Sequence, residues 1–163
     1  MWLLNNLAFN AIWFAAIFFQ NLALPFGVFF IALHCWYFNQ QREIFVVIYV
    51  LLIGIFVDTL LMQLGVFIFE GQQYTIPFWL MLIWAAFGAT INHSLAFLKK
   101  NKQLAFIVGA IFPPLSYFAG EKFGVVTFGY STTSTTLLLA IIWAPLLYHL
   151  TQVSYEKKYF ADA

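Results

Sequence analysis

Charged residues are scarce in this chain. Only 8 % of its 163 residues are Asp, Glu, Lys or Arg, against roughly 25 % in soluble domains, and the formal net charge is +1. This shortage excludes an ordinary soluble domain, and the lack of a basic patch argues against nucleic acid as a partner. Cysteine is scarcer still, because Cys35 stands alone, which excludes a disulfide scaffold and a four-thiolate metal site.

Motifs of known chemistry are also missing. The chain contains no HExxH, no GxSxG, no glycine-rich phosphate loop and no pair of carboxylates within one apolar segment. Its three histidines are scattered along the sequence and give a weak case for a metal. We therefore expect no catalytic residues, no metal and no cofactor, and we lean toward a protein that is not an enzyme.

Apolar residues are what the chain has in abundance. They make up 64 % of the sequence, Phe alone occurs 21 times, and the mean hydropathy is +0.89. A soluble core of this size could not hide so much apolar surface, so we predict a membrane protein. A helix needs about 20 apolar residues to cross a bilayer. The segments that qualify are Leu3–Phe19, Leu22–Phe38, Ile44–Leu64, Phe78–Leu98, Leu104–Ala119 and Thr135–Gln152.

The basic residues orient these segments. In a six-span arrangement one side holds Arg42, Lys99, Lys100, Lys102, Lys157 and Lys158, and the other side holds only Lys122. By the positive-inside rule, this asymmetry places both termini in the cytoplasm. We predict an all-α polytopic bundle of six transmembrane helices that forms a single integral membrane domain over residues 1–163. The first segment lacks a basic start and reads as a retained span, although the first two segments could instead form a re-entrant pair.

One charged residue, Asp58, lies inside an apolar segment. A carboxylate in hydrocarbon costs on the order of 3 kcal/mol, so such a residue is retained for structure or for function. Counting about 1.5 Å of rise per residue from the middle of each segment places Trp13, Trp84 and Tyr117 at similar depths, with Asn10 near the centre. Gly54 lies one turn from Asp58 and would let a neighbouring helix approach closely.

Two adjacent prolines, Pro113 and Pro114, interrupt the fifth segment and should kink it. We expect them to border a pocket that opens outward and is walled by the residues at the depth of Asp58. That pocket would comprise Asp58, Asn10, Trp13, Trp84, Tyr117, Pro113 and Pro114. The alternative, which we favour slightly, is that Asn10 and Tyr117 hydrogen-bond Asp58 only to hold helices together.

A second polar group, Thr90, His93 and Ser94, lies in the cytoplasmic half of the fourth segment. Thr90 and Ser94 are one turn apart and should bond to helix carbonyls or across a helix interface. His93 is separated from Asp58 by about 13 Å in depth, so we expect a structural histidine and no direct contact. The hydroxyl-rich stretch Ser131–Thr136 is interpreted as an N-terminal cap of the sixth helix.

Several of these residues share the spacing of a known family. The pattern comprises Asn6-x3-Asn10-x2-Trp13-Phe14, Gly54, Asp58, Gly65, Pro77-x-Trp79, Trp84, Phe87, Thr90, Ser94-Leu95, Pro114-Leu115-x-Tyr117 and Gly120. It resembles an uncharacterised family of small bacterial inner-membrane proteins, domain of unknown function 2878. Asn10 and Pro113 depart from the family, in which Gln and Gly are expected. The resemblance implies the architecture above, no established activity and a tilt toward a lipid-related role.

A broader similarity points elsewhere. Gly54-x3-Asp58 followed by Leu64-Gly65 resembles six-span cell-shape proteins and the substrate-binding subunits of vitamin-uptake transporters. We predict a multi-pass protein of the bacterial inner membrane that acts as a binding or scaffold component for a lipid, a small ligand or a partner protein. The alternatives are a small-molecule or proton-coupled transporter, or its binding subunit, and then a membrane-embedded lipid-modifying enzyme. Expected partners are membrane lipids, and either another membrane protein or a second copy of the chain.

Overall fold

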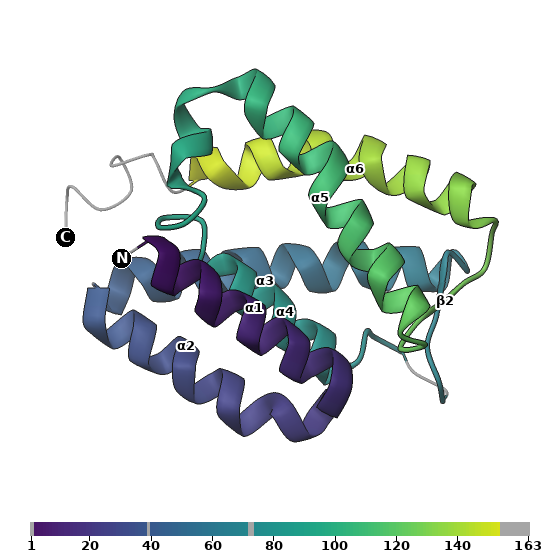
Figure 1. The fold of residues 1–163 in the computed structure, drawn as a ribbon, viewed down its shortest axis with the longest axis horizontal. Coiled ribbons are helices and arrows are strands. Elements are labelled where there is room, and N and C mark those ends of the chain that lie inside the picture. Colours follow the sequence, from purple (N-terminus) through teal and green to yellow (C-terminus); the bar gives the residue numbers. More distant parts are fainter. Residues whose placement is uncertain (1, 39, 72–73, 154–163) are drawn as a thin grey trace.

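The computed structural model describes residues 2–38, 40–71 and 74–153. Within these residues the chain is all-α, as predicted, apart from one short strand pair. The helices are α1 (Trp2–Phe19), α2 (Leu24–Phe38), α3 (Gln40–Gln63), α4 (Phe78–Gly88), α5 (Lys102–Lys122) and α6 (Thr132–Val153). Successive helices run in alternating directions, so the loops gather at two opposite ends of the bundle (Figure 1). Strands β1 (Phe67–Ile68) and β2 (Thr127–Phe128) pair antiparallel and join two loops at one of these ends.

The first two helices form a tight hairpin. A 3₁₀ helix, η1 (Gln20–Ala23), joins them, and Gln20 adopts a positive φ of 47° at its start. This left-handed residue reverses the chain within the two-residue polar break that separates the apolar segments. Helices α1 and α2 therefore lie side by side in antiparallel orientation (Figure 1).

Four helical stretches are long and apolar enough to cross a membrane. They are the stretch Trp2–Phe38, which includes the hairpin turn, and then Gln41–Gln63, Lys102–Lys122 and Thr132–Val153. Helix α4 has only 11 residues, or about 16 Å of rise, against the roughly 30 Å of the hydrocarbon core. The prediction of a helix over Phe78–Leu98 is therefore wrong beyond Gly88. The segment that follows is irregular up to the 3₁₀ helix η2 (Ala96–Lys100).

Polar side chains explain why α4 stops early. The Thr90 hydroxyl donates to the Phe87 carbonyl at 2.6 Å, and the Asn5 amide of α1 donates to the Ala89 carbonyl at 3.0 Å. Asn5 Oδ1 in turn accepts from the backbone N–H of Ser94 at 3.2 Å and from its hydroxyl at 2.7 Å. These side chains supply hydrogen-bond partners to backbone groups that a continuing helix would otherwise have paired. The Phe87 and Ala89 carbonyls and the Ser94 N–H are thereby hydrogen-bonded without a helix.

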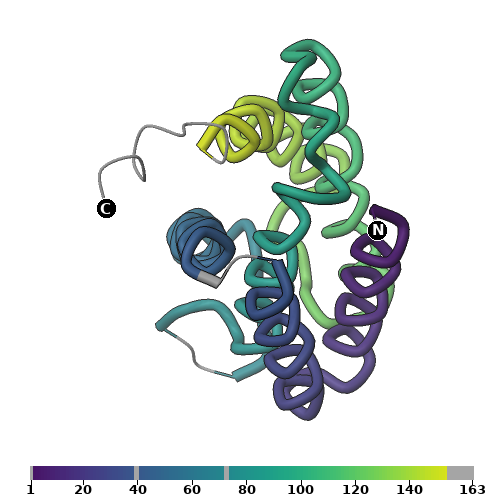
Figure 2. Tube along the Cα trace, turned by 90° about the vertical axis from the view of Figure 1, so that its left-hand side faces the viewer, coloured from purple at the N-terminus to yellow at the C-terminus, as the bar shows by residue number. Residues whose placement is uncertain are grey.

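The helices form two groups. Helices α1, α2, α3 and α4 pack together, while α5 and α6 pack closely along each other (Figure 2). Gly109 permits the second contact, because a Cβ at this position would collide with the backbone carbonyl of Trp143 on α6. The two groups meet through aromatic side chains, among which the indoles of Trp84 and Trp143 stack with ring centroids 4.9 Å apart and planes 12° apart. This junction positions the candidate site.

Candidate functional site

Asp58 connects three helices through its carboxylate. The side chain lies on α3 and is fully buried, at 0 % exposure. Trp84 of α4 donates its indole N–H to Oδ2 at 2.6 Å, and Tyr117 of α5 donates its hydroxyl to both carboxylate oxygens at 2.8 Å. A buried carboxylate requires such donors, because no water reaches it to replace them.

Close packing seals this carboxylate from its surroundings. Gly54 lies against the indole of Trp84 so closely that a Cβ would overlap the ring. On the other side, the ring of Tyr117 stacks on Phe67 with centroids 5.0 Å apart and planes 10° apart. Both donors are thereby held by ring packing as well as by their hydrogen bonds.

Two other residues of the predicted pocket form different contacts. The Asn10 amide donates to the backbone oxygen of Asn6 at 2.8 Å and to its Oδ1 at 3.1 Å, one turn earlier on the exposed side of α1. The Trp13 indole donates to the Ser116 hydroxyl at 2.9 Å, which connects α1 to α5. The depth estimates were therefore useful for Trp84 and Tyr117, whereas the expected bond from Asn10 to Asp58 is wrong.

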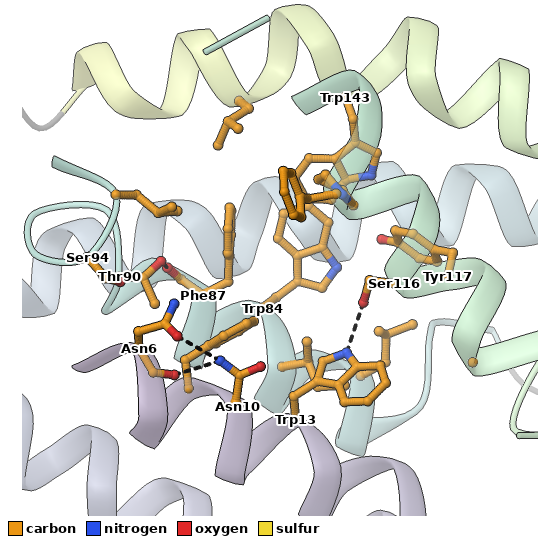
Figure 3. A pocket seen from close by; sticks show the side chains of 18 of the residues that line it. Asn6, Asn10, Trp13, Trp84, Phe87, Thr90, Ser94, Ser116, Tyr117 and Trp143 are labelled. Atoms are coloured by element: carbon orange, nitrogen blue, oxygen red, sulfur yellow. Dashed lines mark hydrogen bonds between the residues drawn. The ribbon is translucent and has the colours of Figure 1, made fainter. Parts of the chain in front are cut away.

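A groove of about 930 Å³ runs between the two groups of helices. Apolar and aromatic side chains of α1, α4, α5 and α6 form most of its wall (Figure 3). The polar side chains along it are Asn6, Asn10, Thr90, His93, Ser94, Ser116 and Tyr117. Asp58 is not part of this lining, because Trp84 and Tyr117 stand between its carboxylate and the groove.

Most residues of the predicted pocket lie along the same groove as the second polar group. Tyr117 and Ser116 are near one end of it, and Thr90 and Ser94 are near the other (Figure 3). Pro113 faces the groove, whereas Pro114 is buried within α5, and the helix continues through both prolines. The sequence predicted two separate sites, and the structure places both sets, except Asp58 and Pro114, along one elongated cavity.

A cluster that the sequence reasoning missed lies where α1 begins. His34 of α2 and His93 of the irregular segment each place Nε2 3.3 Å from Oε2 of Glu43 on α3. The rings of the two histidines are perpendicular, with centroids 4.7 Å apart. A sequence signal did exist, because the predicted topology assigned all three residues to the same membrane side. Helix rotation, which decides whether they meet, was not available from the sequence.

A hydrogen-bond chain orients the carboxylate of this cluster. The Asn92 amide donates to Glu43 Oε1 at 3.2 Å, and the Lys99 ammonium donates to Asn92 Oδ1 at 2.9 Å. Burial lowers the pKa of Lys99, and the nearby charge of Arg42 lowers it further. With Oε1 of Glu43 bound to Asn92, the other carboxylate oxygen, Oε2, faces the two imidazoles. Among the described residues, His34, Glu43 and His93 form a group whose donor atoms lie within 4.8 Å of one another, close enough to hold a metal ion.

A family model described as protein of unknown function (DUF2878) matches residues 2–148. This match confirms the resemblance that the residue spacing indicated. No curated protein and no solved structure matches the chain. The comparisons therefore establish the family and assign no activity.

Proposed function

The chain belongs to the DUF2878 family of proteins of unknown function, and on that premise we propose that it binds a membrane lipid in the groove between its two groups of helices. In this proposal it is a multi-spanning component of a bacterial inner membrane with no enzymatic activity of its own. The observation that carries the proposal is the groove itself, whose volume of about 930 Å³ lies within the roughly 300–1,000 Å³ of typical ligand sites.

The chemistry of the wall supports an apolar ligand. Aromatic and aliphatic side chains from four helices form most of it, with amides and hydroxyls at intervals. Such a wall provides contact area for an acyl chain and few groups that could fix a strongly polar molecule. Three apolar residues along the groove are largely exposed, namely Trp2 at 68 %, Phe97 at 58 % and Phe112 at 64 %. In a bilayer these side chains would contact lipid, so the groove would be continuous with the membrane interior.

The distribution of charge supports the orientation within this proposal. Four basic residues lie at the end of the bundle where α1 begins. They are Arg42 near the start of α3, Lys99 and Lys100 in η2, and Lys102 at the start of α5. Lys122 lies at the opposite end of α5. The proposed topology has six crossings with both termini in the cytoplasm, and the irregular segment after α4 completes the fourth crossing. Lys157 and Lys158, which entered the prediction, lie outside the described residues.

The burial of Asp58 supports a binding role over a carrier or an enzyme. A proton-coupled carrier would use this carboxylate as its titrating group, and a lipid-modifying enzyme would need it in the cavity. Asp58 is fully buried, and Trp84 and Tyr117 occupy its oxygens. Its role in the proposal is to fasten α3, α4 and α5 together, which keeps one wall of the groove in place.

Retention of lipid by the purified protein tests the proposal. Native mass spectrometry in a mild detergent should detect lipid bound to the wild type. Ile83→Trp, which places an indole in the groove, should lower the bound fraction. Ile141→Trp is the matched control, because Ile141 is 72 % exposed on α6 and lies outside the groove. Equal retention by the two variants, or no retained lipid in the wild type, would contradict lipid binding in the groove.

A further inference from the structure

Two imidazoles and one carboxylate converge from three different elements of the fold. His34 lies near the end of α2, Glu43 in the first turn of α3 and His93 in the irregular segment after α4. One donor atom from each residue lies within 4.8 Å of the other two. We propose that these three residues bind a divalent transition-metal ion of the zinc class. The proposal does not rest on lipid binding, although His93 also borders the groove.

The distances suit such an ion. Donors about 2.0–2.1 Å from a tetrahedral zinc ion are separated from one another by about 3.3 Å. Both histidines already place Nε2 3.3 Å from Oε2 of Glu43. The two imidazole donors, within 4.8 Å of each other, would close to about 3.3 Å around the ion.

The contacts that His93 makes with the described residues leave its Nε2 atom without a hydrogen bond. Its Nε2 lies 3.3 Å from the Glu43 carboxylate, but without hydrogen-bond geometry, and this buried nitrogen has no hydrogen-bond partner within the described chain. A buried polar atom without a partner costs free energy. Coordination of a metal through the nitrogen lone pair would remove this cost.

The surroundings resemble the outer shell of a metal site. Asn92 holds Oε1 of Glu43, and such partners orient a ligating carboxylate. The ring of Phe38 lies 4.0 Å from the ring of His93 and covers the site on one side. The side-chain exposures of His34, Glu43 and His93 are 11 %, 6 % and 17 %, so the site is largely dry but reachable.

The donor set indicates the class of ion. Two imidazoles with one carboxylate suit zinc and similar divalent ions, whereas magnesium and calcium prefer oxygen donors throughout. Three protein ligands also leave a fourth position for water or another exchangeable ligand. Cobalt(II) is the appropriate probe, because it accepts the same ligands and gives visible absorption bands when it is bound.

To test the proposal, the full chain is purified in detergent with an affinity tag that contains no histidines, and it is then titrated with cobalt(II). The wild type should bind one ion per chain with visible absorption bands, and zinc should displace the cobalt. His93→Gln should weaken binding by at least about 100-fold, and Asn92→Ala by about 10–100-fold, as expected for loss of a supporting residue. His149→Gln is the matched control, since His149 contacts Tyr49 on another face and should not affect binding.

A second measurement uses only the wild type, so that it does not depend on variants that fold. Zinc should slow the modification of His34 and His93 by diethyl pyrocarbonate, while His149 reacts at an unchanged rate. The proposal is overturned if excess cobalt(II) produces no absorption bands with the wild type. It is also overturned if His93→Gln and His149→Gln bind equally well, or if zinc protects all three histidines alike.

Discussion

Removal of one hydroxyl group tests whether Asp58 holds the helices together. Tyr117→Phe deletes the donor that contacts both oxygens of Asp58 at 2.8 Å. The ring itself should stay in place, because it stacks on Phe67. Water cannot replace the lost donor, because Asp58 is fully buried. The substitution therefore removes the hydrogen bonds with little other change to the structure.

Two reference values bracket the expected loss. Hydrogen bonds to charged groups contribute about 1.5–3 kcal/mol in soluble proteins. Bonds between helices in a membrane average about 0.6 kcal/mol with a maximum near 1.7, because the unfolded chain in the membrane also finds partners. The Tyr117 hydroxyl contacts two oxygens in a dry site, so we expect a loss near the membrane maximum, about 1.5 kcal/mol. This corresponds to about a tenfold change in the unfolding equilibrium.

The assay is unfolding in mixed micelles at increasing SDS, followed by tryptophan fluorescence. Tyr49→Phe is the control, since its hydroxyl contacts His149 at an exposed position and its loss should cost less than about 0.5 kcal/mol. A double-mutant cycle with Asp58→Asn should give a coupling energy of at least about 0.5 kcal/mol. Equal losses for the two tyrosine variants, or zero coupling, would refute the role given to Asp58.

Three further substitutions test individual contacts at the site, in the irregular segment and at the start of α6. Gly54→Ala should destabilise the fold by about 1–3 kcal/mol and shift tryptophan emission, because the new Cβ overlaps the Trp84 ring. Asn5→Ala should speed hydrogen exchange at the amide of Ser94, which loses its acceptor, and unchanged exchange would contradict the contact. Ser131→Ala should cost about 1 kcal/mol in micelle unfolding, since the Ser131 hydroxyl oxygen accepts an N–H in the first turn of α6.

Hydropathy was sufficient to predict most of the helices. The segment Ile44–Leu64 corresponds to α3, and Leu104–Ala119 lies within α5. Long apolar segments in a bilayer must satisfy their backbone internally, so their composition is enough to predict a helix. The fourth segment failed because its end depends on Asn5, far away in sequence, which offers the backbone other partners.

Depth along the membrane was predictable, but rotation about each helix axis was not. The rise per residue placed Trp84 and Tyr117 level with Asp58, and both donate to it. It placed Trp13 at a similar depth too, yet that indole donates to Ser116. The contacts of His34 and Glu43 were missed for the same reason, since the faces on which two helices meet are set by packing over their whole length.

The bonds made by Asn5 have a consequence for the order of assembly. During synthesis, α1 emerges long before the segment that follows α4. When that segment enters the membrane, the amide of Asn5 is already present to receive the Ala89 carbonyl and the Ser94 N–H. The polar backbone groups of the irregular segment therefore have a hydrogen-bond partner as soon as they enter the membrane. Helix α1 is thus in place to supply hydrogen-bond partners to the least regular part of the bundle, and a chain with its order of helices permuted would lose that advantage.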